Sequence, residues 1–296
     1  MRKLNNIFKL FLAANLLLLV AACGKENVSN DNVIVNLSGF MESHGDIDGK
    51  DAVAAKATLA EYGNIQAVTL AFYNSSNQRV FNQTHLRADY ADNINGFCRF
   101  SASLRPGDYR MVAVAYKNEA PLSLNSPTEA VLSTPCRETF CLSEDFQVTS
   151  TGTQYYSKEL KRIVTRLIIR STDSIPVNVT KLILHFGSGD DDSFNPSTGM
   201  ATVDAGFTSE VELNPNYRKV GVQKDFFLAA DQESVGISYE ALNNAGDVLY
   251  SKDLGSFSFQ RNKVTQLKGP MFSAMEIGDF TVDIAWISDT NFHTFK

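Results

Sequence analysis

The chain has 296 residues and a formal net charge of −6. An acidic balance argues against a nucleic-acid partner, which needs clustered Lys and Arg. The length is comfortable for two domains, and the content of Val, Ile, Thr, Phe and Tyr favours strands.

Residues 1–22 have the features of a secretory signal peptide. Three positive side chains precede an apolar run, Leu10–Ala22, that is shorter than the ~20 residues of a membrane-spanning helix. The run ends in Val20-Ala21-Ala22-Cys23, which resembles the lipobox of bacterial lipoproteins. This resemblance implies that Cys23 carries a covalent diacylglycerol and an N-acyl lipid, and we expect no other cofactor. Cleavage would leave 274 residues and move the charge to −9, and polar residues 23–31 would form a flexible, lipidated tether.

The first half of the mature chain shows short strand patterns. Val33–Leu37 is an extended run, and Gln66–Tyr73 with a return from Arg79 predicts a hairpin. Within Phe97–Tyr116, two strands flank a Pro106-Gly107 turn, and the pattern Leu-x-Pro-Gly-x-Tyr resembles the hairpin of transthyretin-like β-sandwich domains. That resemblance implies that Tyr109 packs back over the turn.

A polar stretch, Thr149–Gln154, is the predicted boundary between two domains. Before it we expect a loop over residues 118–135 and a strand at Phe140–Val148. After it the same pattern restarts, with strands expected at Ile163–Arg170, Lys181–Phe186, Asp225–Ala229, Gly236–Leu242, Asp247–Tyr250, Asn262–Phe272 and Phe280–Trp286. This spacing predicts an all-β protein of two tandem transthyretin-like or immunoglobulin-like β-sandwich domains, residues 32–150 and 151–296.

The sequence contains no recognisable catalytic or metal-binding constellation. Its His residues (His44, His85, His185 and His293) are scattered, and its acidic runs at Asp190–Asp192 and around Asp46, Asp48 and Asp51 lack the distal Glu of a calcium loop. We therefore expect solvated loops rather than metal sites, and no enzyme activity.

Three cysteines remain besides Cys23: Cys98, Cys136 and Cys141. One disulfide with one free thiol, or three buried free thiols, are both open, because spacing alone does not give the pairing. Cys136 and Cys141 have no neighbouring His, which argues against a zinc site.

The order of these features resembles the FimB-type fimbrillin-associated anchor lipoproteins of anaerobic Gram-negative bacteria. The resemblance covers nearly all of the mature chain, and it is carried by the lipobox, the Pro-Gly-x-Tyr turn, Lys158–Arg170 and Phe257–Phe272. The most specific part, Arg-Asn-x-Val-Thr-x-Leu-x-Gly-x-x-Phe, is shared with fimbrillin stalk and tip subunits. The resemblance implies a structural protein that ties a pilus to the cell outer membrane, with fimbrillin-type stalk pilins as its partners.

In that family, subunits join when an extended segment of one chain completes a sheet of another. Stalk subunits lose their first strand after cleavage at an Arg, whereas residues 24–50 here contain no Arg. This favours an anchor that retains Val33–Leu37 and ends fibre growth. A stalk or tip subunit, or a surface lipoprotein that binds a glycan or a host ligand, is the alternative.

The C-terminal segment Phe280–Phe295 is the candidate for contact with the stalk pilin. Its apolar side chains alternate, in the order Phe280, Val282, Ile284 and Trp286. Two interpretations stay open: a strand that is donated to the neighbouring pilin, or the last strand of the second sandwich.

Overall fold

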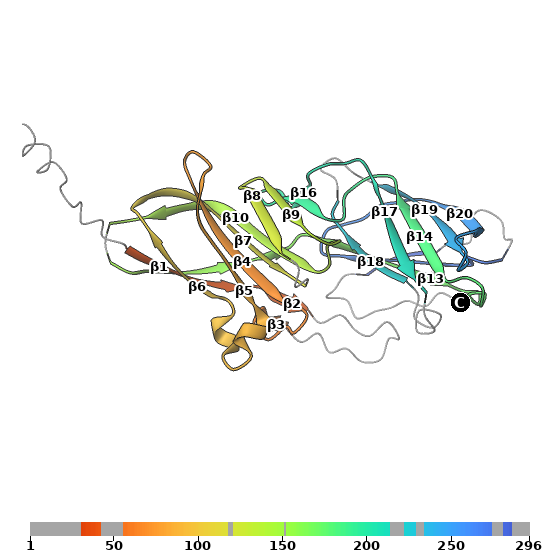
Figure 1. The fold of residues 1–296 in the computed structure, drawn as a ribbon, viewed down its shortest axis with the longest axis horizontal. Coiled ribbons are helices and arrows are strands. Elements are labelled where there is room, and N and C mark those ends of the chain that lie inside the picture. Colours follow the sequence, from red (N-terminus) through yellow and green to blue (C-terminus); the bar gives the residue numbers. More distant parts are fainter. Residues whose placement is uncertain are drawn as a thin grey trace, which may run out of the picture.

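The computed structural model describes residues 31–42, 56–117, 121–150, 152–213, 222–228, 234–273 and 281–285. These residues form strands, with two short 3-10 helices at Arg87–Tyr90 (η1) and Ile94–Gly96 (η2). Figure 1 shows an elongated molecule in which strands of the two halves of the chain lie toward opposite ends. The predicted all-β sandwich fold is confirmed.

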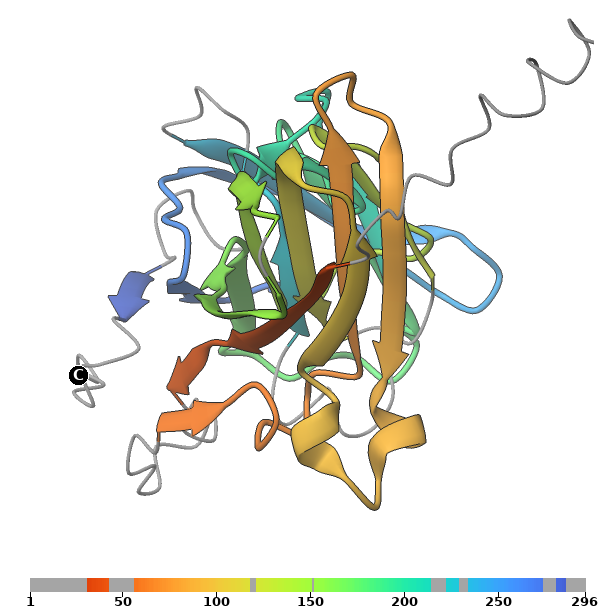
Figure 2. The same cartoon turned by 90° about the vertical axis from the view of Figure 1, so that its left-hand side faces the viewer.

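The first sandwich consists of a three-stranded and a five-stranded sheet. The smaller sheet has the order β11 (Gln154–Glu159), β1 (Asp31–Ser38), β6 (Arg99–Leu104). The larger has the order β12 (Lys161–Arg162), β10 (Thr139–Val148), β7 (Gly107–Tyr116), β4 (Ala67–Asn74), β5 (Arg79–Leu86). Figure 2 looks onto this end of the molecule and shows β1, in red, running obliquely to the left of the long orange strand β5.

From Met111 to Tyr116, strand β7 is buried on both faces, which explains the continuous apolar sequence of this part. Met111, Ala113 and Ala115 belong to the core between the two sheets. The alternating residues Val112 and Val114 belong to a second apolar cluster on the other face of the larger sheet.

The two strands around Pro106-Gly107 do not form the hairpin that the resemblance to transthyretin-like domains implied. β6 pairs with β1, whereas β7 pairs with β4 and β10, so the turn crosses from one sheet to the other. Both edges of β7 are already occupied, which leaves β6 no place beside it. The Tyr109 hydroxyl donates a hydrogen bond of 2.7 Å to the Arg105 carbonyl, as expected for a Tyr that packs over the turn.

The second sandwich consists of two four-stranded sheets around one apolar core. One sheet has the order β18 (Val222–Phe226), β13 (Thr165–Ser171), β21 (Val264–Gly269), β22 (Thr281–Ala285). The other has the order β17 (Phe207–Glu212), β14 (Lys181–Phe186), β19 (Val235–Leu242), β20 (Val248–Phe257).

A further sheet joins the two halves, and it corrects the expected loop at residues 118–135. Its order is β16 (Met200–Ala201), β15 (Ser193–Asn195), β9 (Glu129–Leu132), β8 (Leu122–Ser126). Two short strands, β2 (Phe40–Glu42) and β3 (Lys56–Thr58), pair separately. Because β9 of the first half pairs with β15 of the second, the halves share a sheet as well as an apolar cluster.

Strand pairing continues across the predicted boundary at Thr149–Gln154. β11 pairs in parallel with β1, and β12 pairs with β10. Leu160, between them, belongs to the core of the first sandwich. Strands of the first sandwich therefore extend to Arg162, while the division of the chain at residue 150 stays a prediction.

Candidate functional site

The N-terminal strand β1 occupies the middle of its sheet. It pairs with β11 in parallel over Val33–Ser38 and with β6 in antiparallel over Asp31–Asn36. Apolar side chains stand at every second position, Val33, Val35 and Leu37, and this period of two gives the strand one buried face.

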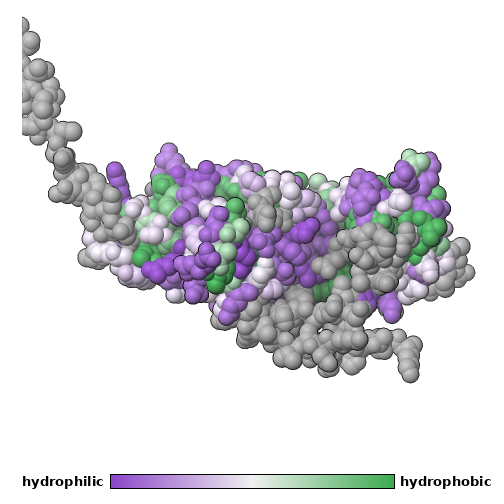
Figure 3. Space-filling view, turned by 60° about the horizontal axis from the view of Figure 1, so that its bottom comes forward, coloured by the Kyte–Doolittle hydropathy of each residue, from purple (hydrophilic) through white to green (hydrophobic). Residues whose placement is uncertain are grey.

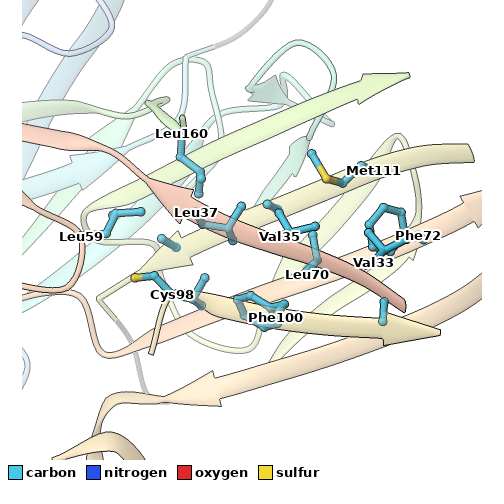
Figure 4. Packing of buried hydrophobic residues seen from close by; sticks show 14 of the residues in the cluster. Val33, Val35, Leu37, Leu59, Leu70, Phe72, Cys98, Phe100, Met111 and Leu160 are labelled. Carbon is cyan, nitrogen blue, oxygen red and sulfur yellow. The ribbon is translucent and has the colours of Figure 1, made fainter. Parts of the chain in front are cut away.

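Figure 4 shows the side chains that β1 contributes to the core. Val33 and Val35 are 0% exposed and Leu37 is 4% exposed. They lie among residues of both sheets, including Leu70, Phe72, Phe100 and Met111. Ile34 is half-buried and Asn36 is exposed, on the opposite face. The predicted strand Val33–Leu37 is confirmed, and it is an integral part of the first sandwich.

Hydrogen bonds at the end of β1 extend this attachment. The Leu37 amide donates to the Cys98 carbonyl at 2.9 Å, and the Leu160 amide donates to the Ser38 carbonyl at 2.8 Å. The Ser38 hydroxyl also donates to the Lys158 carbonyl at 3.2 Å. The segments on both sides of β1 therefore remain hydrogen-bonded to it as far as its last residue, Ser38.

The C-terminal segment contributes an edge strand to the second sandwich. The backbone of Thr281–Ala285 pairs in antiparallel with Val264–Lys268 of β21. Among the strands that the structure describes, β22 has no partner on its other side. Phe280 and Trp286 lie outside the described residues, as do the side chains of Val282 and Ile284. The donated-strand interpretation stays a prediction.

Several further predicted features also lie outside the described residues. These are the signal peptide, Cys23 and the tether up to residue 30, the acidic run around Asp46, Asp48 and Asp51, and His44 and His293. Their roles stay predictions.

Charged side chains gather where the two sandwiches meet, and sequence patterns did not indicate this cluster. Arg162 pairs with Glu138 at 2.8 Å, and these side chains are 7% and 1% exposed. Two more ion pairs of 2.7 Å each, Arg166–Asp225 and Lys224–Asp191, lie nearby. Arg162, Arg166, Glu138 and Asp225 help to line a cavity of about 10 Å³, which is at the lower limit of what a single water molecule needs.

The charged side chains of the cluster are bound by partners within the protein. Glu138 also accepts a 2.6 Å hydrogen bond from Tyr62, and burial, followed by this contact, raises the pKa of Tyr62 to about 12. Burial lowers the pKa of Arg162, against the opposing effect of Glu138. A buried ion pair adds little net stability but is costly to break. Each ion pair joins segments of one sandwich, Arg162 with Glu138 in the first and the other two pairs in the second. Across the junction, the Arg162 guanidinium donates a hydrogen bond of 2.9 Å to the Asn262 side chain.

All three cysteines beyond Cys23 are buried free thiols, which decides between the two predicted arrangements. Burial raises the pKa of Cys98 to about 11 and that of Cys141 to about 12, and it also raises the pKa of Cys136. These thiols are therefore poor nucleophiles at neutral pH.

The acidic run at Asp190–Asp192 is satisfied within the protein. Asp190 accepts hydrogen bonds from the amides of Asp191 and Asp192 and from the Ser193 hydroxyl. His185 lies 3.6 Å from Glu240 on the outer face of the second sandwich. Within the described ranges, no group of three or more His, Cys, Asp or Glu residues could hold a metal ion.

Few large apolar side chains are exposed on the described surface. On the face in Figure 3, hydrophilic residues cover much of the described surface and hydrophobic residues form separate patches between them. Tyr155 is the one aromatic residue among the exposed large hydrophobic side chains of the described segments. None of the helices in these segments is long and apolar enough to cross a membrane.

Comparison with protein families matches residues 46–294 to a family of unknown function, DUF6562. No curated protein matches the chain. Among solved structures, the chain is similar to a protein of Bacteroides thetaiotaomicron described as one of a group of candidate polysaccharide-binding proteins (DUF1812). The two are 12% identical with a TM-score of 0.52, over 88% of this chain and 99% of that one.

Two fimbrial proteins of Porphyromonas gingivalis also match. The tip protein Mfa3, with a C-terminal truncation, is 11% identical with a TM-score of 0.42, over 86% of this chain and 98% of that one. The anchor protein Mfa2 is 11% identical with a TM-score of 0.44, over 80% and 90%. At 12% identity, the similarity to the Bacteroides protein shows a shared fold only. The TM-scores of the two fimbrial proteins are lower, and we draw no conclusion about the role of this chain from them.

Proposed function

We propose that this chain, which belongs to the family of unknown function DUF6562, is a non-enzymatic fimbrial anchor that holds a pilus on the outer membrane through lipidated Cys23. The observation that carries the proposal is the position of β1, which is paired on both sides and buried in the first sandwich. In strand addition, a neighbouring subunit supplies the strand that completes a sheet. A subunit that fills this position with its own strand accepts none there, so the fibre ends at it.

The sequence just before β1 supports the membrane role. Only residues 24–30 separate Cys23 from Asp31, the first residue of β1. Two or more acyl chains give stable membrane attachment. The lipid on Cys23 would thus be connected directly to the retained strand β1. Cleavage of the chain before β1 would release the subunit from the membrane.

Replacing Cys23 tests this proposal directly. In a Cys23→Ala strain we expect the protein to fold and the pili to appear in the medium instead of on cells. Cys98→Ala is the matched control, because it removes a thiol but leaves the lipidation residue. Pili that stay cell-bound in the Cys23→Ala strain would contradict lipid anchoring. Absence of fimbrillin-like chains in a pull-down of the lipidated protein would contradict the fimbrial role itself.

For the contact with the stalk pilin, the segment around Phe280, Val282, Ile284 and Trp286 is the leading choice. Its backbone forms an edge strand whose outer side is unpaired among the described strands, and such an edge is where another chain adds. Deleting residues 280–296, which removes this edge strand together with the tail that follows it, should reduce co-purification of pilin. Undiminished pilin binding by a folded deletion variant would remove the role of this tail.

A further inference from the structure

One end of the first sandwich gathers three chain segments at the point where β1 begins. We name this end the N-terminal pole; it consists of the turn Arg105–Asp108, the loop 149–153 and the start of β1. The strand register brings them together through the pairs Asp31 with Leu104, Val33 with Gln154, and Gly107 with Val148. Figure 1 places the start of β1 at one end of the long axis and β20 toward the other.

The distance from the pole to the proposed lipid is short. Eight residue steps separate Cys23 from Asp31, and a fully extended chain of that length spans at most about 28 Å. A flexible chain of eight residues has an average end-to-end distance of about 16 Å. The residue proposed to carry the lipid can therefore be at most about 28 Å from the start of β1.

From this geometry we infer that the N-terminal pole faces the lipid headgroups and that the second sandwich points away from the membrane. The inference rests on the proposed lipidation of Cys23. The turn Arg105–Asp108 is exposed, as are Thr149, Ser150, Gly152 and Thr153 in the loop, so polar groups meet the headgroup layer. Arg105 offers a cation for lipid phosphate, and Tyr155, which is 67% exposed beside the pole, is a residue type enriched at membrane interfaces.

The orientation has a structural consequence for the partner. β22 belongs to the second sandwich and pairs with β21. With the pole against the membrane, that edge is displayed away from the lipid surface, where a pilin could reach it. The opposite orientation would bring the second sandwich to the membrane, which a tether of this length does not favour.

Fluorescence quenching on vesicles tests the orientation. The probe is the lipidated full chain in phosphatidylethanolamine–phosphatidylglycerol vesicles that contain headgroup-labelled nitroxide lipid. One fluorophore is placed through Ser150→Cys at the pole or, as the matched variant, through Asn244→Cys in the exposed turn between β19 and β20. The buried native thiols do not compete for the label. Ser150→Cys that also carries Cys23→Ala is the control without lipid.

We expect nitroxide lipid to remove most of the emission at position 150 and little at position 244. Equal quenching at both positions, or stronger quenching at position 244, in a protein that floats with the vesicles would overturn the orientation alone. A lipidation-competent protein that does not float would overturn lipid anchoring and the orientation with it.

Discussion

Truncating Val35 tests whether β1 is part of the mature protein. Val35 is completely buried, between Phe100 of β6 and Tyr156 of β11 in the strand register. Val35→Ala removes two methyl groups, worth about 0.8 kcal/mol each in transfer free energy, and it leaves a cavity. Together these effects should lower the free energy of unfolding by about 2–3 kcal/mol. For a domain of this size, the melting temperature should fall by about 5–10 °C.

The neighbouring residue provides the matched control. Asn36 lies on the same strand but is exposed, so Asn36→Ala should change stability by no more than about 0.5 kcal/mol. Urea unfolding of the mature protein, followed by far-ultraviolet circular dichroism, measures both variants. If Val35→Ala were as stable as Asn36→Ala, β1 would not be packed in the mature fold. The argument for a retained strand would then fail.

Three further predictions concern the junction, the thiols and the second sandwich. Glu138→Ala removes the ion-pair partner of the buried Arg162 guanidinium and should cost about 3–5 kcal/mol in thermal unfolding, whereas Glu210→Ala at a more exposed ion pair should cost under about 1 kcal/mol; equal costs would contradict a stabilising role of the buried pair beside the junction. Cys98, Cys136 and Cys141 should react with a thiol reagent at pH 8 only after unfolding, and rapid labelling of native protein would show that burial does not protect them. Burial opposes ionisation of Asp173, but hydrogen bonds from Ser171 and the amides of Met271 and Phe272 outweigh it and lower the pKa of Asp173 from 3.8 to about 2. The stabilisation is therefore present above pH 3.8 and is lost as the pH falls to about 2; Asp173→Asn should lack this part of the pH dependence of unfolding, and an unchanged profile would contradict it.

Strands with clear alternation were predictable because side-chain burial repeats every second residue. In β6, Phe100, Ala102 and Leu104 are buried while the residues between them are exposed, and the sequence pattern shows the same period. β8 and β9 were missed because they are short, with two buried residues at most in each. Their sheet is completed by β15, some 60 residues further along the chain, and a single sequence does not show such a partner.

Turn chemistry predicted where the chain reverses but not which strands pair. Pro106 and Gly107 favour a tight turn in a hairpin and in a crossing between sheets alike. The difference lies in whether β7 has a free edge, and that depends on β4 and β10. The junction cluster was missed for a similar reason, because Arg166 and Asp225 are 59 residues apart and nothing local relates them.

The path of force through the molecule links β1 to the junction. A force on the tether would act along the axis of β1. To pull this strand out of its sheet, the force would have to break its hydrogen bonds to β6 and β11 together. From β11 the chain passes through Leu160, Ile163 and Val164, all buried, directly into β13. The shared sheet of β9 and β15 and the Arg162–Glu138 pair lie beside this connection. The connection between the sandwiches is therefore packed rather than hinged, which suits the proposed role of a subunit under tension between a membrane and a fibre.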